Sequence, residues 1–334
     1  MNLKVGIHQR FPGADLSGGV KGSFFHPAYR SHPKSIPYRS VRDLLHSMEW
    51  PGSFNFIGDY PENSSPGWTN NIQGVTHDAN HWFFTQADRL WKIPLSHDLN
   101  QHVSQSDFPN APIPNALRDA GGNHMGSLDF FENLLYVPLE GTSPPSLLIF
   151  EAATLQFLGS GPLVQQNDAP WCAVNPRNRL LYTSHFNSKA LFDSEPLIVY
   201  RPNIIADTSG GIIGADPEFL YHFDLFGGNG GPIAPTRIQS GTFSPSGHFY
   251  LLSDVDDGGL MGFDMTTGRL IFQKTRNSFP AGVEMEGVTV FDIDGRGAPN
   301  LGGQIHIVWD DLEPGSDDVY FSHLQVAPAS RGAV

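Results

Sequence analysis

The sequence has a single cysteine, Cys172, among its 334 residues. One cysteine cannot form an intrachain disulfide, so a disulfide framework is excluded. Cys172 lies in the apolar run from Ala169 to Val174, where a buried and unreactive thiol is the ordinary expectation. The fold must therefore be held together by the burial of apolar side chains.

Basic residues are also scarce. The chain has 20 Lys and Arg against 34 Asp and Glu, which gives a formal net charge of −14. Such a surface repels a phosphate backbone and would release few counterions on binding, which argues against nucleic acid as a partner. The excess of acid has two explanations that charge does not separate, solubility and the binding of a cation or cationic ligand.

Long apolar runs are missing as well. No stretch approaches the roughly 18 consecutive apolar residues of a transmembrane helix, and residues 1–10 contain Lys4, His8 and Arg10 without the apolar core of a signal peptide. We therefore expect a soluble, cytoplasmic protein without a membrane partner.

The glycine-rich run from Gly227 to Gly231 does not open a helix in a βαβ unit, which a phosphate-binding loop would do. No nucleotide cofactor is therefore expected.

The residues that are abundant favour short strands. The chain has 36 Gly, 27 Pro, 24 Phe and 9 Tyr, a composition that supplies tight turns and half-buried strands and suits long helices poorly.

An internal repeat organises most of the chain. Five segments share one pattern, in which a small residue stands early in a strand, a polar turn follows, and an aromatic or aliphatic strand ends on a polar side chain. The segments begin at Gln73, Met125, Trp171, Ser240 and Glu286, at intervals of 52, 46, 69 and 46 residues. This period predicts an all-β fold, a β-propeller of five four-stranded blades. The long third interval contains an insertion, and a sixth blade hidden there or in residues 1–52 is the alternative.

One domain preceded by an arm is expected from this pattern. Residues 1–52 do not follow the repeat, and we interpret them as an N-terminal arm lying over the disc, with a partly disordered tail as the alternative. Residues 53–334 form a single propeller domain. The last repeat lacks a fourth strand, while the segment 53–60 is a strand without a partner, so pairing the two would close the ring and remove exposed edges.

One face of the propeller collects polar side chains. In a blade, the innermost strand starts on the same axial face on which the second strand ends, so the repeat gathers these residues near the axis. They are Gln73, Asn123, His124, Asp168, Trp171, Arg237, Gln239, Glu284 and Glu286 at strand starts and Gln86, Glu140, His185, Asp254 and Asp310 at strand ends. Converging carboxylate and amide oxygens suit a hard divalent cation such as Ca²⁺, whereas a water-filled axial channel is the alternative.

Several of these side chains also suit catalysis. His124 and His185, with carboxylates nearby, are candidates for proton transfer near neutral pH, although each could be a core histidine bound to a backbone carbonyl. Arg237 would hold an acidic group of a substrate. Trp171 would stack on a sugar ring or pack in the core, and the predicted substrate contacts are completed by Gln239, Glu140 and Asp254.

Two repeats carry a family resemblance. The segments 175–182 (NPRNRLLY) and 243–250 (FSPSGHFY) resemble the inner hairpins of YVTN/NHL-type and SMP-30/gluconolactonase-like β-propellers. The resemblance to the gluconolactonase-like group implies a central calcium ion, and the positions that match its ligands are Glu286, Asn123, Asp168 and Gln73. That group has six blades, and Arg237 and Gln239 stand where it has a further asparagine.

The functional prediction follows from the asymmetry of the axial residues. They differ from blade to blade, which favours one site over five equivalent ones. We expect an enzyme that acts on a polar small molecule or saccharide by hydrolysis or elimination, with possible assistance from a divalent metal. The alternative is a non-catalytic propeller, either a glycan-binding lectin or a protein-interaction module. The sequence does not define an oligomeric state.

Overall fold

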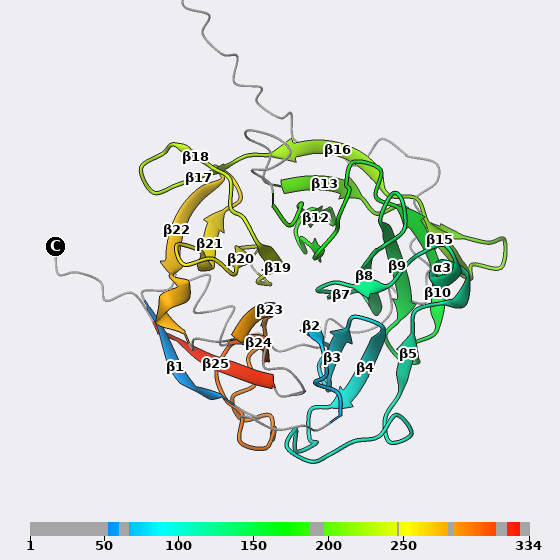
Figure 1. Cartoon of the computed structure of the whole chain (residues 1–334), viewed down its shortest axis with the longest axis horizontal. Helices are drawn as coiled ribbons and strands as arrows, with labels where there is room; N and C mark the ends of the chain where they lie inside the picture. The colour runs from blue at the N-terminus through cyan, green and yellow to red at the C-terminus, as the bar shows by residue number, and fades with distance from the viewer. Residues whose placement is uncertain are drawn as a thin grey trace, which may run out of the picture.

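The structure, a computed structural model, describes residues 53–59, 67–187, 197–245, 247–279, 283–311 and 319–327. Small antiparallel sheets stand around a common axis and form a five-bladed β-propeller (Figure 1). The predicted fold class is confirmed, and the six-bladed alternative is wrong. Residues 1–52, which we interpreted as an arm, lie outside the described residues.

Each blade begins at the axis and runs outward. The first blade contains β2 (Ile72–His77), β3 (His81–Gln86), β4 (Arg89–Pro94) and β5 (Asn110–Pro112). The second contains β6 (His124–Met125) and β7 (Asp129–Phe131), which both pair with β8 (Leu134–Glu140), then β9 (Ser146–Glu151) and β10 (Phe157–Pro162). The third contains β11 (Ala173–Val174), β12 (Leu181–Thr183), β13 (Leu197–Arg201) and β16 (Glu218–Phe223). The fourth contains β19 (Ile238–Phe243), β20 (Phe249–Ser253), β21 (Gly259–Asp264) and β22 (Arg269–Lys274).

The fifth blade is built from distant parts of the chain. It contains β23 (Val283–Val290), β24 (Ile305–Asp311), β25 (Val319–Ala327) and, outermost, β1 (Ser53–Asp59). β1 pairs antiparallel with β25, so a strand that precedes the first blade completes the last one. The fifth blade also contacts the first directly, because β23 packs against β2. The ring is therefore closed.

Two additions depart from the repeat. The insertion in the third blade forms a hairpin of β14 (Ile204–Ala206) and β15 (Ile212–Ala215), which lies against the outer strand β10 of the second blade. The glycine-rich run is the turn between β17 (Leu225–Phe226) and β18 (Pro232–Ile233), and β17 extends the fourth blade beside β22. Both additions cover blade edges that would otherwise be open to pairing with another chain.

Helices are short in the described part of the chain. α3 (Asn115–Asp119) is a single turn and η1 (Arg276–Ser278) is a 3-10 turn. No helix among these residues has the length and apolar character needed to cross a membrane.

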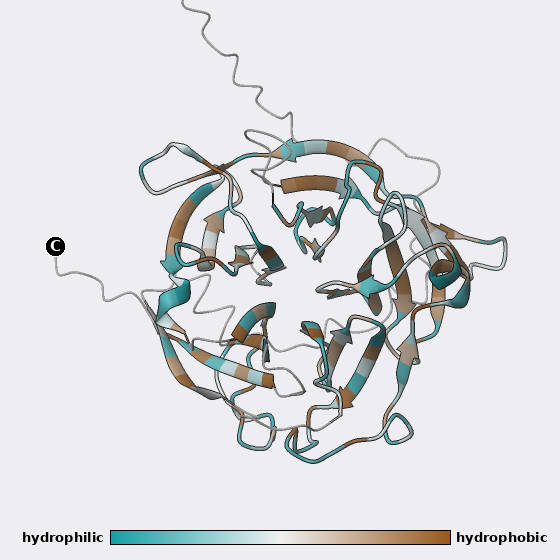
Figure 2. Ribbon diagram, viewed as in Figure 1, coloured by the Kyte–Doolittle hydropathy of each residue, from teal (hydrophilic) through white to brown (hydrophobic). Residues whose placement is uncertain are grey.

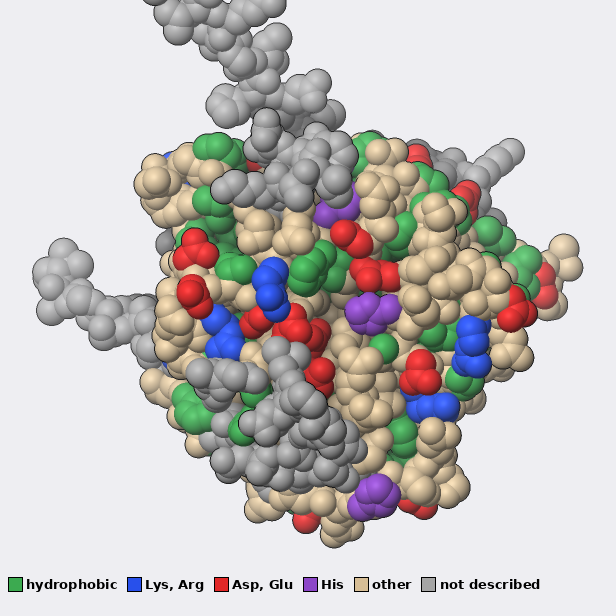
Figure 3. All heavy atoms as spheres, viewed as in Figure 1, with side chains coloured by type: hydrophobic (Ala, Val, Ile, Leu, Met, Phe, Trp, Pro, Cys, Tyr) green, Lys and Arg blue, Asp and Glu red, His purple; other side chains and the backbone are tan. Residues whose placement is uncertain are grey.

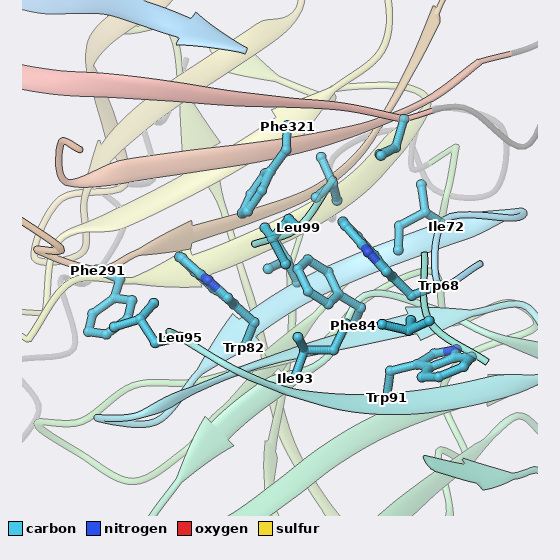
Figure 4. Close-up of a cluster of buried hydrophobic side chains, with 14 of the residues drawn as sticks. Trp68, Ile72, Trp82, Phe84, Trp91, Ile93, Leu95, Leu99, Phe291 and Phe321 are labelled. Carbon is cyan, nitrogen blue, oxygen red and sulfur yellow. The ribbon is translucent and has the colours of Figure 1, made fainter. Parts of the chain in front are cut away.

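The apolar core is divided among the interfaces between blades. Five clusters of buried side chains occur, and each contains residues of two neighbouring blades. Between the first and fifth blades, the Trp82 ring lies 5.3 Å from both Phe291 and Phe321 (Figure 4). Strands such as β9 and β13 are hydrophobic over most of their length, whereas hydrophilic residues occur in many of the turns (Figure 2). Each blade is therefore stable only when it packs between two others.

The inner strands approach one another closely at the axis. A Cβ atom placed on Gly126 would lie 2.1 Å from the carbonyl oxygen of Pro170, and one on Gly74 would lie 2.5 Å from the Cα of Ser127. The hydroxyl groups of Ser127 and Ser240 are 2.8 Å apart, which joins the second blade directly to the fourth across the axis. The middle of the propeller is thus packed.

This packing makes Gly126 sensitive to substitution. We expect Gly126→Ala to lower the free energy of unfolding by about 1–3 kcal/mol, because the methyl group collides with backbone atoms that cannot move without opening the blade interface. Gly228→Ala is the control, since no atom lies within 4 Å of a Cβ at that position. Its effect should stay below about 1 kcal/mol. Denaturant unfolding measures both, and equal effects would contradict close packing at the axis.

Candidate functional site

The predicted polar residues do meet at one end of the axis, which we call the strand-start face. Strand register places His124 opposite Glu140 and Glu284 opposite Asp310, and the amide of Asp254 donates to the carbonyl of Arg237. Figure 3 shows a face of the disc on which Asp and Glu side chains gather around the middle, beside His and Lys or Arg side chains.

A first group on this face surrounds His124. Its Nδ1 lies 3.2 Å from Oε2 of Glu140, and its Nε2 lies 2.6 Å from Oε1 of Gln73 in the first blade. Oε1 of Glu140 accepts a hydrogen bond of 2.8 Å from the amide of Ala169. Asn123 lies beside this group, and its backbone N–H donates to the backbone carbonyl of Glu140. The His124 side chain is 39% exposed, so a carboxylate orients an imidazole that solvent can reach.

A second group surrounds His185 and is sealed. Nδ1 of His185 lies 3.0 Å from Oδ1 of Asp168, which also accepts a hydrogen bond from the amide of Phe186. The His185 side chain is only 1% exposed. A substrate on the strand-start face could not touch this ring, so its surroundings fit the core histidine that was the alternative to a catalytic role.

Trp171 is also buried completely. Its Nε1 donates to Oγ of Ser184, and its ring lies 5.7 Å from Phe249 and covers the space where Gly241 has no side chain. The ring offers no exposed face to a sugar. Core packing accounts for this tryptophan, and stacking on a ligand does not.

The third group joins the fourth and fifth blades and is the most acidic. Nη2 of Arg237 donates to Asp254, at 2.9 Å, and to Glu284. Nε2 of Gln239 donates to Glu284 at 2.8 Å and to Glu286 at 3.4 Å. The guanidinium of Arg237 is therefore already bound by two carboxylates.

Arg276 completes this third group. Its Nε donates to Asp254 at 2.9 Å, which holds that carboxylate between two arginine side chains. Sequence reasoning missed Arg276 because it lies in the turn after the outermost strand of its blade, a position without a counterpart in the repeat. The sequence did contain an indication of this role. Arg276 follows a strand of the blade that contributes Asp254, and an arginine side chain commonly pairs with a carboxylate.

Glu286 differs from the other carboxyl groups. Its side chain is buried, with 4% exposed. Burial raises the pKa of Glu286 well above its usual value of 4.5, and the negative charges of Glu284, Asp310 and Asp254 raise it further, while Arg237 opposes them. Glu286 therefore keeps its proton under conditions that ionise an ordinary glutamate.

The residues expected to hold calcium do not form one cluster. Gln73 contacts His124, Asp168 contacts His185, and Glu286 contacts Gln239. Within the described ranges, no three His, Cys, Asp or Glu side chains are grouped as metal ligands would be. These contacts do not support a calcium site, and the cation stays a prediction of the sequence.

The state of Glu286 makes the stability of the protein depend on pH. Above about pH 4.5 the unfolded chain ionises this carboxyl while the folded protein keeps it protonated, so folding loses stability as the pH rises. The loss should reach about 1.4 kcal/mol per pH unit until the folded group also ionises. Glu286→Gln removes the loss, so the free energy of unfolding of this variant, relative to that of the wild type, should increase as the pH rises above about 5.

Chemical unfolding of both proteins across this range measures the difference. Glu218→Gln is the control, because Glu218 lies exposed on the outer strand β16. The difference in the free energy of unfolding between Glu218→Gln and the wild type should not grow as the pH rises. A flat difference for Glu286→Gln would mean that Glu286 ionises normally in the folded protein.

Comparisons with known proteins find similar solved structures but no family. No family model matches the sequence, and no curated protein matches it. Similar solved structures include a protein of unknown function from Bacteroides caccae, with 13% identity over 78% of this chain and 90% of that one and a TM-score of 0.40. Another is a protein of unknown function from Bacteroides thetaiotaomicron VPI-5482, with 11% identity over 82% of this chain and 74% of that one and a TM-score of 0.40. The resemblance to YVTN/NHL-type and gluconolactonase-like blades therefore stays a prediction.

Proposed function

We propose that the strand-start face is the active site of an enzyme that acts on a neutral polar small molecule or saccharide by hydrolysis or elimination. The observation that carries the proposal is the buried carboxyl group of Glu286 among ionised carboxylates. Carboxyl groups held in different protonation states are the means by which many enzymes obtain an acid and a base at one pH.

Glu286 would act as the proton donor. Its burial and the neighbouring charge of Glu284 keep it protonated, so it can deliver a proton to the oxygen of a leaving group. Because only 4% of Glu286 is exposed, the substrate would have to reach its carboxyl group by replacing the contact that Gln239 makes with it. A bound substrate would exclude the remaining water.

His124 would act as the base through Nε2, once the substrate takes the place of Oε1 of Gln73 and frees this nitrogen to accept a proton. One of its ring nitrogens faces Glu140, and a carboxylate in that position orients an imidazole and stabilises the positive charge that it gains when it takes up a proton. His124 is also reachable, with 39% of its side chain exposed. His185 offers the same pairing with Asp168 without that access, so we assign the base to His124.

The charge of the face disfavours an acidic substrate. Glu140, Asp254 and Glu284 contribute negative charge, and Arg237 is already bound by two of them. An acidic substrate would be repelled, and Arg237 could bind it only by releasing a partner. Sugar hydroxyls can instead donate to these carboxylates and to Gln239. Arg237 thus positions carboxylates in this proposal and does not hold the substrate.

A non-catalytic role is the second candidate, and one observation favours it. The polar side chains of this face bind residues of neighbouring blades, as Gln73 does with His124 and Arg237 does with Glu284. Side chains arranged in this way could serve to join blades and bind a glycan or protein without reaction. Glu286 is the residue that such a role does not explain, because a buried protonated carboxyl destabilises the fold at neutral pH.

Turnover of a substrate panel separates the two roles. The panel contains nitrophenyl glycosides of neutral sugars, simple esters and lactones, together with a glycan array for binding. We expect hydrolysis or elimination of at least one neutral substrate, and a loss of about 100-fold or more in kcat for Glu286→Gln and for His124→Asn. Glu218→Gln, on the outer strand β16, should keep full activity.

Other outcomes are also informative. Glycan binding without turnover, lost in Glu286→Gln, would establish the lectin role instead. Full activity in both Glu286→Gln and His124→Asn would remove the strand-start face as the active site.

A further inference from the structure

The inner strands end in a second site, at the opposite end of the axis from the strand-start face. A pocket of about 550 Å³ opens there, and all five blades contribute to its wall. Its lining includes Thr76, Phe131, Val174, Phe243 and Thr289, one from each blade in order. The packed middle of the propeller separates this strand-end pocket from the strand-start face, because the Ser127 and Ser240 hydroxyls meet between them.

A carboxyl group lies directly behind the wall of this pocket, bound to residues that line it. Asp129 accepts hydrogen bonds from the amide of Val174, at 2.7 Å, and from the hydroxyl of Thr76, and both of these residues line the pocket. The amide of Phe130 donates to it as well, at 2.9 Å. Asp129 thus stands between the first, second and third blades and remains partly exposed. Among the described ion pairs, none involves this carboxyl.

Aromatic rings form the other part of the wall. Phe130, Phe131 and Phe243 all line the pocket. The guanidinium of Arg179 already lies 5.8 Å from the centre of the Phe131 ring, so the wall accepts a cation against an aromatic face. Arg179 also forms an ion pair with Glu132, which balances its charge at the rim.

The rim residues are held by unusual backbone. Glu132 and Asn133 both have positive φ angles, of 49° and 66°, in the two-residue turn between β7 and β8. Arg179 has a φ of 62° in the neighbouring turn between β11 and β12. Positive φ at both central residues is typical of a two-residue hairpin turn, and these turns place Glu132 and Arg179 at the rim of the pocket.

We propose that the strand-end pocket binds a small organic ammonium ion, with the carboxylate of Asp129 as its counter-ion and the phenylalanine rings around its alkyl groups. Aromatic faces together with a carboxylate recognise substituted ammonium groups better than neutral molecules of the same shape. The threonine hydroxyls can hold a polar end of the ligand. A chain with a formal charge of −14 also attracts cations over a distance.

The electrostatics of Asp129 agree with this ligand. Burial raises the pKa of Asp129 to about 7, although its three hydrogen bonds oppose the change. Burial thus disfavours the ionised form of this carboxyl more than its hydrogen bonds favour it. An ammonium ion in the pocket supplies a positive charge that stabilises the ionised form, which a neutral sugar does not.

The test compares choline with 3,3-dimethylbutan-1-ol, a neutral molecule of the same shape, by NMR titration of the full chain. We expect choline to bind at millimolar or lower concentration and the neutral analogue to bind at least about tenfold more weakly. Asp129→Asn should weaken choline binding by about tenfold or more, and Phe131→Leu by about two- to fivefold.

Matched variants give the controls. Asp119→Asn, exposed on α3, and Phe219→Leu, on the outer strand β16, should bind choline like the wild type. Glu286→Gln should also leave binding unchanged, which separates this site from the strand-start face. If Asp129→Asn does not fold, the Phe131→Leu variant and the neutral analogue still decide the question.

Three results would overturn the inference. The first is no binding of choline by the wild type, and the second is equal binding of choline and its neutral analogue. The third is binding that persists in Phe131→Leu at full strength but disappears in Glu286→Gln, which would place the ammonium on the strand-start face.

Discussion

The close approach of the inner strands at the axis is the constraint on which the rest of the structure depends. Gly74 and Gly126 have no side chain to separate the strands, and the hydroxyl groups of Ser127 and Ser240 meet across the centre. Five blades fit around such a centre only when each packs against both neighbours, which is why the apolar core is split into five clusters between blades. The same contact divides the axis into two separate ends.

These two ends differ in chemistry because different types of side chain stand at the starts and at the ends of the inner strands. At the strand starts, carboxylates and amides bind one another from blade to blade, as Arg237 does with Glu284. At the strand ends, phenylalanine and threonine side chains leave a pocket with Glu132 at its rim and the carboxyl of Asp129 behind its wall. Carboxylates are thus numerous at one end, whereas the other has Asp129 and the ion pair of Glu132 with Arg179.

The repeat predicted the architecture well because blade formation depends on local pattern. Small residues such as Gly74 and Gly126 marked the innermost strands, where the lack of a side chain is required. The pattern also brought the polar residues to one face, since strand direction alone determines that grouping. The hairpin of β14 and β15 could not be predicted from the repeat because it has no counterpart in other blades.

Side-chain direction was beyond the reach of the sequence. Trp171 and His185 stand at the predicted positions along their strands, yet both are buried, because neighbouring side chains cover them in three dimensions. Likewise, nothing in the sequence indicates that Arg237 is bound by two carboxylates at once. The strand-end pocket was missed for a different reason, since phenylalanine and threonine at strand ends are ordinary residues of any sheet.

The pairing of β1 with β25 has a consequence for how the protein reaches its native state. Asp59 pairs with Ser322, 263 residues later in the chain, so the ring cannot close until almost the whole propeller has been synthesised. Until then the fifth blade lacks its outer strand and the first blade has no neighbour on one side. Contacts of such long sequence separation form slowly, and the unfinished edges are open to pairing with other nascent chains. The circular arrangement that protects the finished molecule is therefore the source of its greatest vulnerability during biosynthesis.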